Sequence, residues 1–195
     1  MTIVLASTSR IRRQLLEHAG VAVEIAAPPF DEDSKKAAIV HLPAKKMALE
    51  LAAAKALSIA PAQPSDIVIG ADQVLAFAEG RLDKPPDLGA ARNQLLQLRG
   101  KTHRLISAVA CARGSAIAWS HVATAELDVR DFSDAYLDAY LARMGQEATQ
   151  SVGAYKLEGL GAQLFDAVRG DYFTILGLPL LPLLGFLRDS GELPA

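Results

Sequence analysis

The sequence predicts an α/β protein in which helices flank a mixed, twisted sheet. Three observations support this fold class. The chain has 195 residues, of which 51% are hydrophobic and 22% charged, as in ordinary globular domains. Helix-like and strand-like segments alternate along it, and two strand patterns joined at Gly114-Ser115 predict an antiparallel hairpin. We therefore expect one domain over residues 1–195, with two lobes around a central cleft.

The first part of the chain alternates between short strands and helices. "TIVLA" is typical of a buried strand, and "RIRRQLLEHAG" predicts a helix that stops at Gly20. "VAVEIA" alternates like a strand and leads into the loop "APPFDED". A proline in the first turn and many alanines predict a long helix from about Pro43, "PAKKMALELAAAKALSIA". Residues 67–77, "IVIGADQVLAF", predict another buried strand.

The remaining elements follow a turn at "AEGR" and a loop at "DKPPD". "LGAARNQLLQLRG" predicts a helix that ends at Gly100. The hairpin is expected in "HRLISAVACARGSAIAWSHVATAELDVR". Ser133 is a good N-cap for a helix in "SDAYLDAYLARMG". The glycine-rich stretch "GAYKLEGLGAQLF" is expected to be extended, and a last helix is expected over roughly residues 177–189.

Composition excludes several classes of protein. A net charge of -2 argues against sequence-independent binding to nucleic acid, which needs a positive field. The single cysteine, Cys111, allows no internal disulfide and fits a reducing compartment. The most apolar segment, "ILGLPLLPLLGFLR", is too short to span a bilayer and contains Pro179 and Pro182, and the N-terminus has no secretory pattern. We expect a cytoplasmic protein without membrane or nucleic-acid partners.

Asp72 stands in the middle of the apolar strand pattern of residues 67–77. A buried charge destabilises the fold by about several kcal/mol unless it is paired or reaches water. We expect the strand to open onto the cleft at Asp72, where the carboxylate would be hydrated. A carboxylate in such a place can act as a general base.

A phosphate site is predicted where the first strand meets the first helix. Ser7 and Ser9 lie next to a helix N-terminus, whose amides carry partial positive charge. Arg10, Arg12 and Arg13 occupy the first turn, where cations oppose the helix dipole unless an anion binds. Alternatively, Ser9 only caps the helix and the arginines are solvated. The hydroxyls, helix start and arginines together favour the phosphate site.

Two lysines are further candidates. Lys55 follows Met47 and Leu51 at a spacing of four residues, so it borders the apolar face of its helix. Its alternative role is snorkelling, in which the stem is buried and the ammonium reaches water. Lys84 lies in "DKPPD", where two prolines stiffen the backbone, and this segment alone favours an ordinary surface lysine.

The acidic residues suggest a hard-metal site. Asp31, Glu32 and Asp33 follow a proline pair, and with Asp72 they could supply oxygen ligands to Mg²⁺ or Mn²⁺, although a solvated acidic loop needs no function. Zinc is not expected, because Cys111 has no partner and the histidines lack ligand spacing. Phosphate-binding P-loop and Rossmann glycine patterns are also absent. Asp72 therefore fits the base of a phosphoanhydride hydrolase.

Seven segments resemble the Maf family of nucleoside triphosphate pyrophosphatases in the expected order. They are "LASTSRIRRQLL", "AAAKA", "IGADQV", "DKP", "GKTH", "GAYKLEGLGAQLF" and "GLPL". The resemblance implies a Maf- or ITPase-like fold, with a mixed sheet and two lobes around a deep cleft, and often a homodimer. It also implies cleavage between the α- and β-phosphates, which releases pyrophosphate and a nucleoside monophosphate.

The resemblance also implies roles for individual residues. Asp72 takes the position of the catalytic proton acceptor, and Glu32 matches an acidic metal-site position. Phosphate-binding or catalytic positions fall on five residues: Ser7, Ser9, Arg12, Lys55 and Lys84.

Substrate choice is indicated by Gln73 and Glu158. Both resemble the branch of the family that acts on 7-methyl-GTP, whereas many other members have threonine after the catalytic aspartate. Ile11 departs from the pattern, because it cannot provide the stacked indole expected in that branch. The alternatives are a dTTP/UTP pyrophosphatase, or a nucleotide-sensing regulator of cell division. Without the family pattern, Glu158 would instead be interpreted as an exposed strand residue beside Gly159 with no part in binding.

Overall fold

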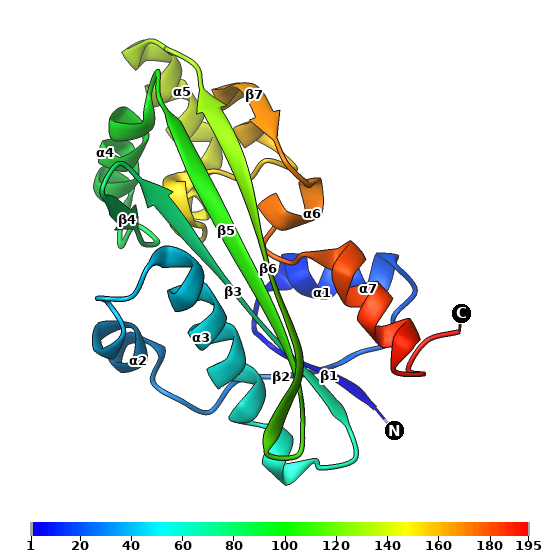
Figure 1. The fold of residues 1–195 in the computed structure, drawn as a ribbon. Coiled ribbons are helices and arrows are strands. Elements are labelled where there is room, and N and C mark those ends of the chain that lie inside the picture. The colour runs from blue at the N-terminus through cyan, green and yellow to red at the C-terminus, as the bar shows by residue number, and fades with distance from the viewer. Residues whose placement is uncertain (1, 195) are drawn as a thin grey trace. The chain divides into compact units, whose positions relative to one another are not determined.

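The computed structural model describes residues 2–194, and within them seven strands form one mixed sheet (Figure 1). The order of the strands is β2-β1-β3-β5-β6-β7, with β4 paired to β3. β1 is parallel to β2 and β3, whereas β4 is antiparallel to β3 and β7 is antiparallel to β6. The mixed sheet predicted from the sequence is therefore confirmed. The strands are β1 (Ile3–Ala6), β2 (Glu24–Ala26), β3 (Ile67–Phe77), β4 (Gly80–Leu82), β5 (Thr102–Arg113), β6 (Ala116–Val129) and β7 (Phe165–Arg169).

Seven α-helices accompany the sheet in the described part of the chain. They are α1 (Arg10–His18), α2 (Glu32–Ala38), α3 (Ala44–Leu57), α4 (Leu88–Leu98), α5 (Asp134–Met144), α6 (Tyr172–Ile175) and α7 (Leu180–Asp189). Short 3-10 helices occur as η1 (Ala60–Ala62), η2 (Gly145–Thr149), η3 (Val152–Ala154) and η4 (Leu160–Leu164). None of the helices within residues 2–194 is long and apolar enough to cross a membrane.

The chain divides into two compact units. Unit 1 combines the described residues up to Gln73 with Ile106–Ala123 and the chain from Tyr172 onward. Unit 2 consists of Val74–Leu105 and Thr124–Asp171. Strands β3, β5 and β6 contribute residues to both units. The expected cleft between two lobes stays a prediction.

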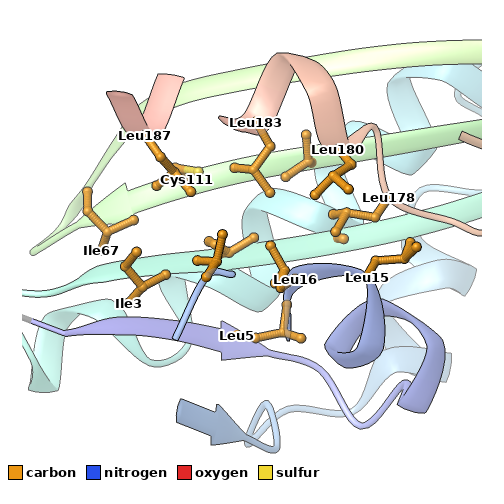
Figure 2. Packing of buried hydrophobic residues seen from close by; sticks show 14 of the residues in the cluster. Ile3, Leu5, Leu15, Leu16, Ile67, Cys111, Leu178, Leu180, Leu183 and Leu187 are labelled. Carbon is orange, nitrogen blue, oxygen red and sulfur yellow. The ribbon is translucent and has the colours of Figure 1, made fainter. Parts of the chain in front are cut away.

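In unit 1 both faces of the sheet are buried. Successive residues of β1 and β3 point to opposite faces, and helices cover each face. On one face, β1 and β3 pack against leucines of α1 and α7, as Figure 2 shows. On the other face, the same strands pack against the end of α3 and η1 (Figure 1). The first face contains Ile3, Leu5, Ile67, Ile69, Leu15, Leu16, Leu180, Leu183, Leu187 and Cys111, and the second contains Val4, Ala6, Val68, Ala56, Ile59 and Ala60.

Gly70 allows α3 to pack directly against the backbone of β3. A Cβ atom at this position would lie 2.1 Å from the carbonyl oxygen of Ala52 and 2.6 Å from the amide nitrogen of Ala56. No real side chain tolerates such distances without a shift of the backbone. The part of α3 that contains Ala52 and Ala56 is consequently held close to β3.

Unit 2 has an aromatic centre around His103. Its ring is 2% exposed, its Nε2 lies 2.6 Å from the hydroxyl of Tyr155, and both rings lie near Phe165. Burial lowers the pKa of His103 to about 4, against a smaller opposite effect of Asp128. Near neutral pH this histidine is therefore an uncharged part of the core.

Two expectations about local structure were wrong, and several short elements were not expected. The loop "APPFDED" contains the start of α2, whose N-cap Asp31 accepts hydrogen bonds from the amides of Asp33 and Ser34. The stretch "GAYKLEGLGAQLF" is not extended, because it passes through η3, a turn and η4 before β7. Helix α6 and strands β4 and β7 were not predicted, since each is too short to show a periodic pattern, and β4 begins within the expected turn "AEGR".

We expect Gly70→Ala to lower the free energy of unfolding by at least about 1–3 kcal/mol, because the new methyl group would force α3 away from β3. Gly185→Ala is a matched control in α7, where an added Cβ meets no atom within 4 Å. That control should stabilise the protein by up to about 1 kcal/mol through higher helix propensity. Urea unfolding measures both changes, and equal stabilities of the two variants would contradict the close packing.

Candidate active site

The candidate site lies in unit 1 where β1 and β2 end beside the middle of the longer parallel strand β3. Ala6 of β1 is in register with Ala26 of β2 and with Gly70 of β3. At this level β1 leads into the segment with Ser7 and Ser9, and β2 leads toward Glu32. Asp72 lies in β3 itself, two residues after Gly70. The carboxyl ends of parallel strands are the usual position of ligand sites in α/β proteins.

Asp72 forms a buried ion pair with Lys55. The ammonium Nζ of Lys55 lies 2.6 Å from Oδ1 of Asp72 and 2.9 Å from Oε2 of Glu32. The other oxygen of Glu32, Oε1, lies 2.9 Å from Nζ of Lys36. Two carboxylates and two ammonium groups thus alternate in one charged cluster, Lys36–Glu32–Lys55–Asp72.

This cluster explains why an apolar strand tolerates a carboxylate, and it corrects the expectation of a hydrated Asp72. Asp72 and Lys55 are only 5% and 7% exposed. The charge of Asp72 is compensated mainly by Lys55, which lies on the buried face of α3 with Met47 and Leu51. Snorkelling of Lys55 is excluded as well, because its ammonium group points into the protein and not to water.

The same lysines set the ionisation of Glu32. Partial burial alone would raise the pKa of its carboxyl group, but the hydrogen bonds and charges of Lys55 and Lys36 outweigh burial and lower the pKa to about 2. Glu32 is therefore ionised over the whole neutral range. Both of its oxygens are bound by these lysines.

The start of α1 presents unused hydrogen-bond donors. Ser9 occupies the N-cap position, but its side chain makes no capping hydrogen bond, and the first turn contains no acidic residue. The hydroxyl oxygen of Ser7 accepts a hydrogen bond of 3.1 Å from the amide of Ser9. Ser9 is thus not a simple cap, and this helix end is suited to an anion.

Arg12 braces the segment that follows α6. Its Nε donates to the carbonyl of Gly177 at 2.8 Å, and its Nη1 donates to the carbonyl of Ala71 at 2.9 Å. Burial lowers the pKa of Arg12, and the nearby charges of Asp72 and Glu32 partly offset this effect. A guanidinium has five N–H donors, and these two hydrogen bonds use two of them.

Gln73 makes its contacts within unit 1. Its Nε2 lies 3.0 Å from Oγ of Ser107, 3.1 Å from the carbonyl oxygen of Thr174 and 2.9 Å from that of Ile175. Gln73 follows Asp72 in β3, so their side chains point to opposite faces of the strand. Asp72 and Gln73 therefore have different partners, although they are neighbours in the chain.

Other predicted site residues lie apart from this cluster or outside unit 1. Arg13 is exposed and pairs with Glu17 one turn along α1, with 2.6 Å between Nε and Oε1. Ile11 packs against the core of unit 1. Lys84 is exposed in the loop before α4, and Glu158 is exposed in the turn before η4, both in unit 2. The functional roles of these four residues stay predictions.

Two partners of the site were missed in the sequence. Lys36 follows Glu32 by four residues, a spacing that forms ion pairs on helices, but this spacing carried no meaning while residue 32 was assigned to a loop. Ser107 gives no signal, because a serine inside a strand pattern has many possible partners. Its contact with Gln73 is visible only in the fold.

The cluster can contribute two ligands to a divalent cation. No group of three or more His, Cys, Asp and Glu residues suited to a metal occurs in the described part of the chain. Glu32 and Asp72 nevertheless converge on one atom, Nζ of Lys55. Mg²⁺ is often held by one or two carboxylates with phosphate oxygens and water as the other ligands. The two carboxylates would fit such a site once the Lys55 ammonium, which lies between them, turns toward a phosphate.

Comparison with known proteins shows similarity over nearly the whole chain. Residues 2–190 match a family model described as "Maf-like protein". A nucleoside triphosphate pyrophosphatase of Granulibacter bethesdensis is 47% identical over 99% of both chains. Another, from Paramagnetospirillum magneticum, is 49% identical over 97% of this chain and 99% of its own. A 7-methyl-GTP pyrophosphatase of Rhizobium etli is 44% identical over 98% and 97%.

Replacement of Lys55 by methionine should lower the free energy of unfolding by about 3–5 kcal/mol, because Asp72 would remain buried without its main counter-ion. The double variant Lys55→Met/Asp72→Asn should recover most of this loss, since a neutral amide needs no counter-ion. Urea unfolding of both variants at neutral pH measures the difference. A double variant as unstable as Lys55→Met alone would show that the ion pair is not what the site depends on.

Proposed function

Because the chain belongs to the Maf family, we propose that it is a nucleoside triphosphate pyrophosphatase. Water would attack the α-phosphorus of the substrate, the bond from that phosphorus to the α–β bridging oxygen would break, and pyrophosphate would leave from a nucleoside monophosphate. The observation that carries this proposal is the buried pair of Asp72 and Lys55 beside the start of α1. A carboxylate and donors for phosphate are both needed for this reaction.

Asp72 is proposed as the general base. Its carboxylate accepts a proton from the attacking water as the new bond to phosphorus forms. Lys55 can turn from Asp72 toward the phosphates, because its ammonium group has three donors and a flexible stem. This exchange would free an oxygen of Asp72 for the water and supply positive charge where the leaving group gains negative charge.

The phosphates are proposed to bind at the beginning of α1. Ser7, Ser9 and the open amides of the first turn provide neutral donors, and Arg12 provides a charged one. Arg12 would bind while its Nε stays on Gly177, so the anion would meet a guanidinium that is already oriented. Arg13 and Lys84 are proposed as further cationic contacts to the triphosphate.

A divalent cation, Mg²⁺ or Mn²⁺, is proposed as the cofactor, with Glu32 and Asp72 as its protein ligands. When bound, such an ion neutralises phosphate charge and orients the triphosphate. Glu32 suits this role because its lowered pKa keeps it anionic. Lys36 would hold Glu32 in place through the pair that they form.

The proposed substrate is 7-methyl-GTP or another modified nucleotide. A relative named 7-methyl-GTP pyrophosphatase is 44% identical to this chain, whereas other relatives carry the general name of nucleoside triphosphate pyrophosphatase. Glu158 is proposed to accept the two donors on the Watson–Crick edge of guanine and to favour the positive ring of 7-methylguanine. Gln73 and Ile11 are proposed to shape the rest of the base site. A homodimer and a cytoplasmic location stay predictions from the sequence.

We expect Asp72→Asn to lower kcat by at least about a hundredfold while the protein stays folded, because the amide keeps the shape of the side chain but cannot accept the proton. Asp189→Asn, at the exposed end of α7, is the control and should change kcat little. Release of pyrophosphate from triphosphates measures the effect. Near-normal kcat in folded Asp72→Asn would remove Asp72 from its role, and no hydrolysis by the parent would favour a nucleotide sensor.

Metal removal should abolish hydrolysis, because Glu32, Asp72 and the phosphates would repel one another more strongly without a cation. Protein dialysed against a chelator is expected to regain activity with Mg²⁺ or Mn²⁺. Glu32→Gln should raise the metal concentration that gives half-maximal activity. Full activity of the dialysed protein in excess chelator would exclude the proposed metal role.

The specificity constant kcat/KM should be higher for 7-methyl-GTP than for dTTP or UTP, because a pyrimidine edge offers Glu158 one donor where guanine offers two. Glu158→Gln should reduce this preference, since the amide accepts less strongly and adds a donor. Glu79→Gln, at another exposed glutamate of unit 2, is the matched control. An equal or higher kcat/KM for dTTP or UTP in the parent would assign the chain to the pyrimidine branch.

A further inference from the structure

The hydrogen bonds around Gln73 define the direction of its side-chain amide. Thr174 and Ile175 present backbone carbonyl oxygens to Nε2, and such oxygens can only accept. If the amide were flipped, its Oε1 would face both carbonyl oxygens and repel them. The amino group of Gln73 therefore points toward α6, and the flipped orientation of the amide is excluded.

Ser107 completes this arrangement. Its side chain lies on β5 with the residue 0% exposed, and its hydroxyl donates to the carbonyl of Thr174 at 2.7 Å. Since that donation uses the one hydroxyl proton, the oxygen of Ser107 accepts from Gln73 at 3.0 Å. The chain of hydrogen bonds runs in one direction, from Gln73 to Ser107 to Thr174.

We propose that Ser107 is a positioning residue that acts through Gln73. Together with Thr174 and Ile175 it occupies the amino group of Gln73, so Oε1 is the polar atom that Gln73 offers to a nucleotide. This inference rests on the proposed function and narrows it to the substrate class. A fixed acceptor favours a base edge rich in N–H donors, as in guanine, and disfavours an edge with carbonyl oxygens on both sides of one donor, as in thymine and uracil.

The arrangement also ties the base-reading residue to the catalytic strand. The segment that accepts from Gln73 and Ser107 continues to Gly177, whose carbonyl accepts from Arg12. Gly177 has a φ of +92°, and a Cβ there would lie 3.3 Å from Nη2 of Arg12. Residues on both sides of Asp72 are thus bound to one segment, Ala71 through Arg12 and Gln73 directly.

A double-mutant cycle tests the proposal with Ser107→Ala, Gln73→Met and the double variant. The measured quantity is the ratio of kcat/KM for 7-methyl-GTP to that for dTTP, with kcat for each substrate and thermal unfolding recorded in parallel. Ser107→Ala should lower the ratio by about fivefold, the equivalent of one hydrogen bond, mainly through KM for 7-methyl-GTP. In the Gln73→Met background, Ser107→Ala should cause no further change, and Ser107→Thr in the parent should preserve the ratio.

Three results would overturn the proposal: an unchanged ratio in Ser107→Ala, the same loss in both backgrounds, or an equal fall in kcat for every nucleotide. The last two would indicate a purely structural serine. Ser107→Cys, of similar volume but weaker hydrogen bonding, replaces the alanine variant if that variant does not fold. If the parent hydrolyses no triphosphate, the proposed function fails and this inference with it; if the parent is active and the cycle is additive, only this inference fails.

Discussion

The approach of α3 to the backbone of Gly70 is the constraint on which the site depends. Asp72 lies two residues further along the same face of β3, and Lys55 lies on the face of α3 that packs there. Two opposite charges, each unfavourable alone in a buried place, are brought to 2.6 Å by a contact that involves no polar side chain. A larger residue at position 70 would therefore alter the chemistry of the site without touching its charges.

The pleat of β3 assigns different tasks to three consecutive residues. Ala71 offers its carbonyl to Arg12, Asp72 turns toward Lys55, and Gln73 turns back toward Ser107 and α6. The proposed base and the proposed reader of the nucleotide can thus be neighbours in sequence and still have separate surroundings. Because of this separation, a substitution of Gln73 need not disturb Asp72. Each residue is constrained by its own partners, Lys55 for Asp72 and Ser107 for Gln73.

Much of unit 1 could be predicted because its signals are local. The apolar patterns of β1 and β3, the alanine-rich helix from Pro43 and the position of Lys55 beside Met47 and Leu51 all reflect periodicity. The pairing of Asp72 with Lys55, 17 residues earlier, could not be predicted, because it depends on which helix covers which face of the sheet. The same holds for Ser107, whose partner is 34 residues away, and for Lys36, whose helix was mistaken for a loop.

The buried Cys111 gives the protein a practical property. Its side chain is 0% exposed within the core of unit 1, and burial raises the pKa of its thiol to about 12, so little of the reactive thiolate forms near neutral pH. The native protein should therefore stay unlabelled by thiol-directed dyes and spin labels. One new cysteine in place of exposed Glu79 and another in place of exposed Lys45 would carry nearly all of a label pair, and the distance between the labels would show whether these two positions move when a nucleotide binds.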